Sequence, residues 1–102
     1  MVEVNILYKK KETGREVGLV FAKARVKSAG DRVYSYDLGL KTILDLVATP
    51  EYDPSEGGVF ITKQVMNPGQ YDNYASVWAW VDASTPESTV GSVWINLIAL
   101  GQ

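Results

Sequence analysis

Apolar side chains recur at every second position in several stretches of the chain, and this alternation constrains the fold more than any other feature. The clearest stretch places small apolar side chains on one face: Val20, Ala22, Ala24 and Val26. A period of two puts successive side chains on opposite sides of an extended strand, whereas a helix requires a period near 3.6. The alternation therefore predicts β-strands.

Alternating segments bounded by glycine, proline and polar residues predict about seven strands. We place these strands at residues 2–8, 16–27, 32–37, 43–49, 59–65, 71–82 and 91–100. Between them we expect a polar turn at 9–15, a hairpin turn at 28–31 and a type II turn at 67–70, which has proline and glycine at its two central positions.

Residues 40–47 fit two patterns. Leu40, Ile43, Leu44 and Val47 match helical spacing, but Ile43, Asp45 and Val47 also alternate with their neighbours. We expect one helical turn at Leu38–Thr42, followed by a strand over Ile43–Thr49.

The chain of 102 residues is long enough for one domain with a buried core and too short for two. The predicted fold is all-β: a single-domain antiparallel β-sandwich or jelly-roll-like barrel of about seven to eight strands. Residues 1–15, a first strand and a basic turn, are a candidate arm between subunits. The last strand is apolar on both faces, so we expect it to be central or covered by a partner.

Composition excludes several classes of chemistry. The chain has no His and no Cys, which excludes Ser-His-Asp triads, thiolate nucleophiles and disulfides. The net charge of −2 argues against nucleic acid as a partner, because phosphate binding needs clustered Lys and Arg. No apolar stretch approaches the length of a membrane helix, and we expect no membrane partner. We predict no catalytic residues, no cofactor and no metal.

Acidic residues offer weak alternatives to that prediction. Glu51, Asp53 and Glu56 share one loop, and Asp72–Asn73 and Asp82 form a second group. Oxygen ligands from one loop can hold Ca²⁺, and paired carboxylates can catalyse hydrolysis, but the spacing of a calcium-binding loop is missing here.

Aromatic residues are the better candidates for a site. Trp78 and Trp80 lie two positions apart, hence on one face of a strand. Tyr71 and Tyr74 precede them, and Trp94 would be their neighbour if the last two strands pair. Such rings can form a core, a subunit interface or a platform that stacks on sugars. We take these five residues as a candidate interface or ligand platform.

Two short motifs carry a family resemblance: Leu38-Gly39-Leu40 with Ile43, and Ala99-Leu100-Gly101 at the end of the last strand. With these motifs, residues 16–101 resemble small β-rich structural proteins of tailed bacteriophages, such as capsid decoration (cement) proteins. The resemblance implies a virion protein on the capsid surface, made in the host cytoplasm, without catalytic residues.

The implied partners are the major capsid protein or other virion proteins, with further copies of the chain in a homo-oligomer, which we expect to be a trimer. Two alternatives remain: a small tail or fibre component, and a carbohydrate-binding sandwich that uses the Trp/Tyr platform.

Overall fold

A computed structural model describes residues 3–11, 17–27, 30–51, 60–80 and 93–102. Seven strands and one short 3-10 helix make up their regular structure: β1 (Glu3–Lys11), β2 (Gly18–Val26), β3 (Asp31–Tyr34), η1 (Ser35–Leu38), β4 (Ile43–Pro50), β5 (Phe60–Met66), β6 (Tyr74–Trp80) and β7 (Val93–Gly101). The strand predicted at 43–49 is therefore confirmed against the helical alternative.

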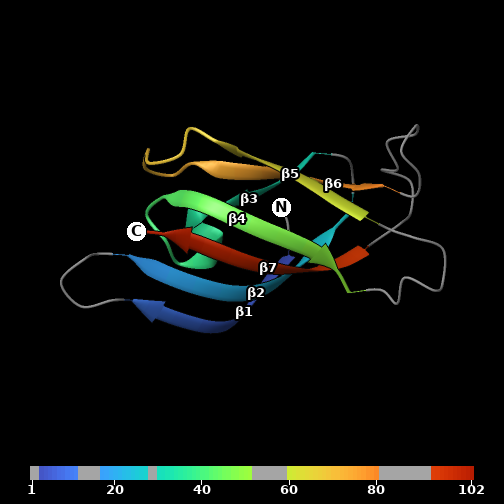
Figure 1. Cartoon of the computed structure of the whole chain (residues 1–102), viewed down its shortest axis with the longest axis horizontal. Helices are drawn as coiled ribbons and strands as arrows, with labels where there is room; N and C mark the ends of the chain where they lie inside the picture. Colours follow the sequence, from blue (N-terminus) through green and yellow to red (C-terminus); the bar gives the residue numbers. More distant parts are fainter. Residues whose placement is uncertain (1–2, 12–16, 28–29, 52–59, 81–92) are drawn as a thin grey trace.

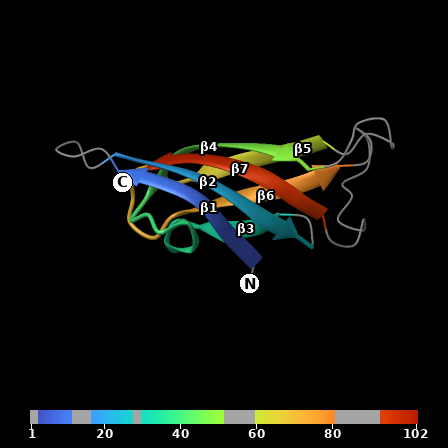
Figure 2. The same ribbon diagram turned by 90° about the horizontal axis from the view of Figure 1, so that it is seen from below.

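The strands form two antiparallel sheets that pack face to face (Figures 1 and 2). The four-stranded sheet has the order β1-β2-β7-β4, and the three-stranded sheet has the order β3-β6-β5. Strand β2 pairs with β7, β3 pairs with β6, and β4 lies beside β5. Strands far apart in the chain therefore pair within both sheets. The predicted all-β sandwich is confirmed.

The core lies between the sheets and comes from the alternation seen in the sequence. Strand β2 contributes its small residues, and β7 contributes Ile95, Leu97 and Ala99, all buried. Ala75, Val77 and Ala79 of β6 face them from the three-stranded sheet. As expected for a strand that is apolar on both faces, β7 is central, between β2 and β4.

Three local predictions are wrong. Lys9, Lys10 and Lys11 belong to β1 and not to a turn, because they pair with residues 18–20 of β2. Residues 28–31 do not join a hairpin, since β2 and β3 lie in different sheets. The helical turn lies at Ser35–Leu38, ahead of the expected Leu38–Thr42, where the Asp37 carboxylate accepts a hydrogen bond from the Tyr34 N–H and Gly39 ends the turn with φ 69°.

The turn at 67–70 is confirmed. The Gln70 N–H donates to the Asn67 carbonyl at 3.1 Å, and Gly69 has φ 89°. A positive φ at the third residue after proline at the second is the geometry of a type II turn, which glycine adopts without strain.

One end of the sandwich is held by buried polar contacts. The Asn73 side chain accepts from the Ile43 N–H at 2.7 Å and donates to the carbonyls of Ile43 and Met66 at 2.8 and 3.1 Å. Thr42 donates to the same amide oxygen at 3.3 Å. These bonds tie the start of β4 to β5 and β6, and thus join the two sheets.

Gly101 completes this end, because a Cβ at its position would lie 2.2 Å from the Thr42 carbonyl oxygen and 2.8 Å from Leu40. We call Leu40, Thr42, Asn73 and Gly101 the closed end. The two motifs that carry the phage resemblance meet there, so their residues serve packing.

Candidate functional site

The outer face of the four-stranded sheet carries one apolar row that crosses every strand. Backbone register aligns Tyr8 with Phe21, Phe21 with Ile98, and Ile98 with Val47. All four side chains are exposed, from 37% for Phe21 to 53% for Val47. We call these four residues the apolar band. Among the described residues, no element covers it.

A β-bulge explains how Tyr8 reaches this face. The register of β1 against β2 shifts between Ile6 and Tyr8, so one extra residue separates the two halves of β1. Before the shift, Val4 and Ile6 pair with residues of the buried face of β2; after it, Tyr8 pairs with Phe21 on the outer face, with ring centroids 5.8 Å apart. A bulge re-aims the side chains that follow it, and here it adds an aromatic ring to the outer face.

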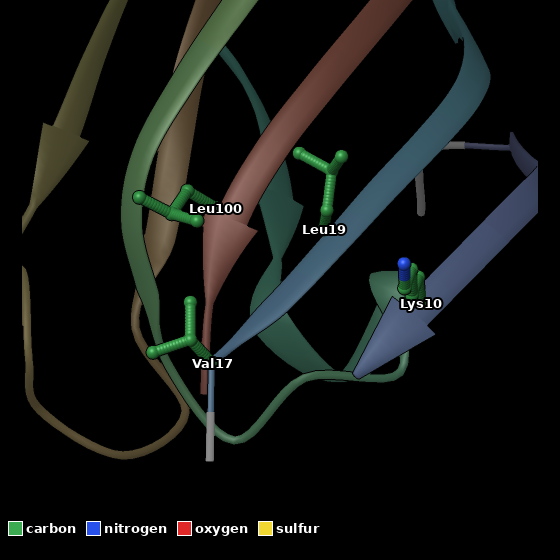
Figure 3. Close-up of a pocket in the computed structure, with 4 residues that line it drawn as sticks. All are labelled: Lys10, Val17, Leu19 and Leu100. Carbon is green, nitrogen blue, oxygen red and sulfur yellow. The ribbon is translucent and has the colours of Figure 1, made fainter. Parts of the chain in front are cut away.

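A shallow hollow of about 300 Å³ lies beside the band (Figure 3). Among the described residues, Lys10, Val17, Leu19 and Leu100 line it, from β1, the residue before β2, β2 itself and β7. These four residues offer one amine beside three aliphatic side chains, a lining that suits an apolar contact.

Charged residues flank the band on both sides. On one side, the next row runs Lys10, Leu19, Leu100 and Asp45, so a cation and an anion occupy its two ends.

On the other side, Lys23 pairs with Glu51 at 2.7 Å and Arg25 pairs with Glu3 at 3.5 Å. The band is therefore an apolar centre with a charged rim, the composition of many protein interfaces.

Asp45 is the acid at the end of the row that contains Lys10. Its carboxylate oxygen Oδ1 accepts from the Leu46 N–H at 2.8 Å and from the Lys63 ammonium at 3.2 Å. These bonds, the backbone one first, lower the pKa of Asp45 below its ordinary value. Asp45 is thus a carboxylate at neutral pH.

The outer face of the three-stranded sheet carries a different cluster, made of Arg32, Tyr34, Tyr36 and Tyr74, which we call the tyrosine cluster. The rings of Tyr34 and Tyr36 stack at 5.0 Å, and those of Tyr34 and Tyr74 lie 5.4 Å apart. The Arg32 guanidinium lies 4.4 Å from the centre of the Tyr74 ring. Most ring faces are therefore occupied by one another.

Tyr36 is the most exposed of the three tyrosines, at 57%. Partial loss of hydration, followed by the charges of Tyr34, Asp37 and Asp72, raises the pKa of Tyr36 above its ordinary value. Its phenol therefore stays neutral at physiological pH and can donate a hydrogen bond.

The structure divides the predicted aromatic platform. Tyr74 and Trp78 lie on the outer face of the three-stranded sheet, half-buried, and Trp80 follows them by register with a side chain outside the described residues. Tyr71 lies in the turn before β6 and is 75% exposed.

Trp94 lies on the other sheet, where the Arg25 guanidinium is 5.9 Å from its ring. The condition for Trp94 to be a neighbour of the other rings, pairing of the last two strands, is not met, because β6 pairs with β3 and β5 while β7 pairs with β2 and β4.

The apolar band was not predicted from the sequence. Phe21 and Ile98 each lie between two core residues of their own strand, so the alternation places their large apolar side chains on the outer face. This pattern was the only indication in the sequence. It was missed because the four residues come from four strands, and only the register aligns them.

The acidic groups considered as metal sites or carboxylate pairs are mostly dispersed or outside the described residues. Asp53, Glu56 and Asp82 lie outside them, Glu51 is paired with Lys23, and the Asn73 amide is used within the closed end. Within the described ranges, no group of three or more potential metal-ligating acidic side chains occurs.

Among the helical residues that the structure describes, none form a segment long and apolar enough to span a bilayer. Comparison with protein-family models, curated proteins and solved structures found no match to this chain.

Proposed function

We propose that the protein is a structural component of a bacteriophage virion, a capsid decoration protein that stabilises the head lattice by protein–protein contacts. The observation that carries the proposal is the apolar band with its charged rim. An apolar centre surrounded by charged residues is the anatomy of many surfaces that bind other proteins.

The resemblance to small virion proteins supports the class of partner. In this proposal the partners are the major capsid protein or other virion proteins and further copies of the chain, on the capsid surface after synthesis in the host cytoplasm. The chain is not an enzyme in this proposal.

Co-sedimentation with purified phage heads tests the proposal. We expect the wild-type chain to pellet with heads in a saturable way. Ile98→Asp, in the centre of the band, should bind at least tenfold more weakly, because it places a charge where apolar surface is buried. Gln64→Asp, an exposed change on the opposite sheet, is the matched control and should bind like wild type. Absence of the wild-type chain from the pellet at saturating concentration would refute the proposal.

A tail or fibre location is separated from the head by the same assay. Heads and tails are fractionated before incubation, and the chain should follow the fraction that carries its partner. Binding to tails alone would move the proposal from decoration protein to tail component.

Carbohydrate binding is the second candidate, and the tyrosine cluster is the observation that favours it. Tyr36 offers an exposed ring, and Trp78 lies on the same face of the sheet. Aromatic rings bind the apolar faces of sugars, and Arg32 adds hydrogen-bond donors.

A glycan array with tryptophan fluorescence tests this candidate. Saturable quenching by a glycan that is lost in both Trp78→Ala and Tyr36→Ala would support it. Quenching that survives both substitutions would exclude this face as the glycan site.

A further inference from the structure

The apolar band leaves open which protein covers it, and the rows on either side of it bear on the answer. Lys10 and Asp45 occupy opposite ends of one row, on the two edge strands of the sheet. If the same row of a second copy lies antiparallel to this one, each Lys10 faces an Asp45 and the charges are complementary.

We infer that the outer face of the four-stranded sheet is a two-fold interface with a second copy of this chain. The inference rests on the proposed function and assigns the apolar band to the second copy. Other surfaces of the dimer then contact the capsid, and Ile98→Asp weakens binding to heads by breaking the dimer. The two-fold axis runs parallel to the strands and passes over the space between β2 and β7. It lies in the plane where the outer faces of the two copies meet.

This axis brings like rows together. Rotation about it places β1 of one copy over β4 of the other and β2 over β7, while every row keeps its position along the strands. Tyr8 then faces Val47 of the second copy, and Phe21 faces Ile98. The apolar band is therefore buried against an apolar band, as in aligned packing of two sheets.

The same rotation brings opposite charges together in the row beside the band. Lys10 of each copy lies near Asp45 of the other, so the contact occurs twice. Both hydrogen bonds that Asp45 makes among the described residues end on Oδ1, and its side chain is 68% exposed, so it can accept from a further ammonium group. In the outermost row the rotation brings Glu3 near Glu51 of the other copy, and each of these acids keeps its own cation, Arg25 or Lys23.

The other in-plane axis fits less well. A two-fold axis perpendicular to the strands, at the centre of the sheet, would lay the apolar band over the row of Asn5, Lys23, Asn96 and Thr49. That arrangement would bury apolar side chains against amides and an ammonium group, at a cost in desolvation.

The area of the face limits the size of the interface. Four strands about 4.8 Å apart and four rows about 6.8 Å apart cover roughly 500 Å² on each copy. A total near 1,000 Å² is at the lower limit for a specific interface, so we expect a reversible dimer.

Sedimentation equilibrium of the purified full chain, without capsids, measures the association. The chain has a mass of 11.2 kDa, so a dimer has twice that mass. We expect a monomer–dimer equilibrium that Phe21→Asp shifts to monomer over the accessible concentration range. A chain that stays monomeric up to millimolar concentration would overturn the inference, as would a trimer or a dimer that Phe21→Asp leaves intact.

Charge reversal tests the axis itself. Lys10→Glu and Asp45→Lys should each weaken the homodimer about tenfold, because each reversal changes two contacts and tenfold corresponds to about 1.4 kcal/mol. Mixed together, the two variants should form a heterodimer preferentially, since both of its charge contacts are again complementary. Native mass spectrometry with one variant ¹⁵N-labelled detects this heterodimer.

Gln64→Glu, which adds a charge at an exposed position of the opposite sheet, is the control and should leave dimerisation unchanged. Random mixing of Lys10→Glu with Asp45→Lys would refute the proposed axis. Failure of these tests is distinguishable from failure of the proposed function, because capsid binding is measured separately by co-sedimentation.

Discussion

The closed end and the apolar band place opposite kinds of side chain against the usual pattern of burial. At the closed end, polar groups are buried and each Asn73 amide group has a partner. In the band, apolar groups are exposed and no described residue of the chain covers them. The difference teaches that stability and association reside in separate parts of this small domain, so substitutions should change one property without the other.

The largest expected effect is at the closed end. Gly101→Val should unfold the protein or cost more than about 4 kcal/mol, because its side chain would overlap the Thr42 carbonyl and Leu40. Chemical denaturation measures the loss. Gly69→Ala is the control, since a Cβ there meets no atom within 4 Å and only its positive φ is strained. A stable Gly101→Val variant would show that the two segments at this end can separate without cost.

Adjacent residues Leu97 and Ile98 on β7 compare the effect of substitutions in the core and in the band on stability. Leu97→Ala should cost about 2–5 kcal/mol of unfolding free energy, because Leu97 is fully buried between the sheets. Ile98→Ala should cost less than about 1 kcal/mol, since its side chain is already half exposed, yet it should weaken self-association. Equal destabilisation by both substitutions, measured in urea, would contradict the assignment of the two faces.

Asn73→Ala tests the polar part of the closed end. It removes the oxygen that accepts from the Ile43 N–H and the amide nitrogen that donates to the carbonyls of Ile43 and Met66. We expect the free energy of unfolding to fall by about 2–4 kcal/mol. Asn67→Ala, in the exposed turn, serves as the control for loss of an amide side chain and should cost less, since Asn67 has a positive φ but no buried partner among the described bonds. Dimerisation of the folded Asn73→Ala fraction should be unchanged.

The smallest expected effect is a pH dependence at the rim of the band. Because the folded state lowers the pKa of Asp45, this group stabilises the fold above its ordinary pKa of 3.8, and that contribution disappears as the pH falls through the lowered value. The melting temperature should therefore fall slightly less between pH 6 and pH 2.5 in Asp45→Asn than in wild type. Lys63→Met should remove part of the same difference, and an unchanged difference in both variants would contradict the role of these bonds.

Most of the secondary structure could be predicted from the sequence. The alternation located all seven strands, and Pro68 with Gly69 identified the type II turn. The ends of elements were less predictable: Lys9, Lys10 and Lys11 suggest a turn by their charge, but pairing with β2 keeps them extended. Local charge does not show whether a partner strand is present.

The candidate site was predictable only in part. Tyr74 and Trp78 share a face because they lie an even number of positions apart on β6, as the spacing requires. Trp94 could not be assigned to a neighbour from the sequence, because the pattern of β7 is the same whether it pairs with β6 or with β2 and β4.

The sequence by itself determined which residues are extended and which side chains share a face of each strand, because a period of two is a local property of the backbone. Only the tertiary structure decided which strands share a sheet and in what register, because pairing joins residues far apart in the chain. The apolar band depends on both. Each of its residues points outward by the local alternation, but the four form one surface only because three registers and the bulge in β1 align them.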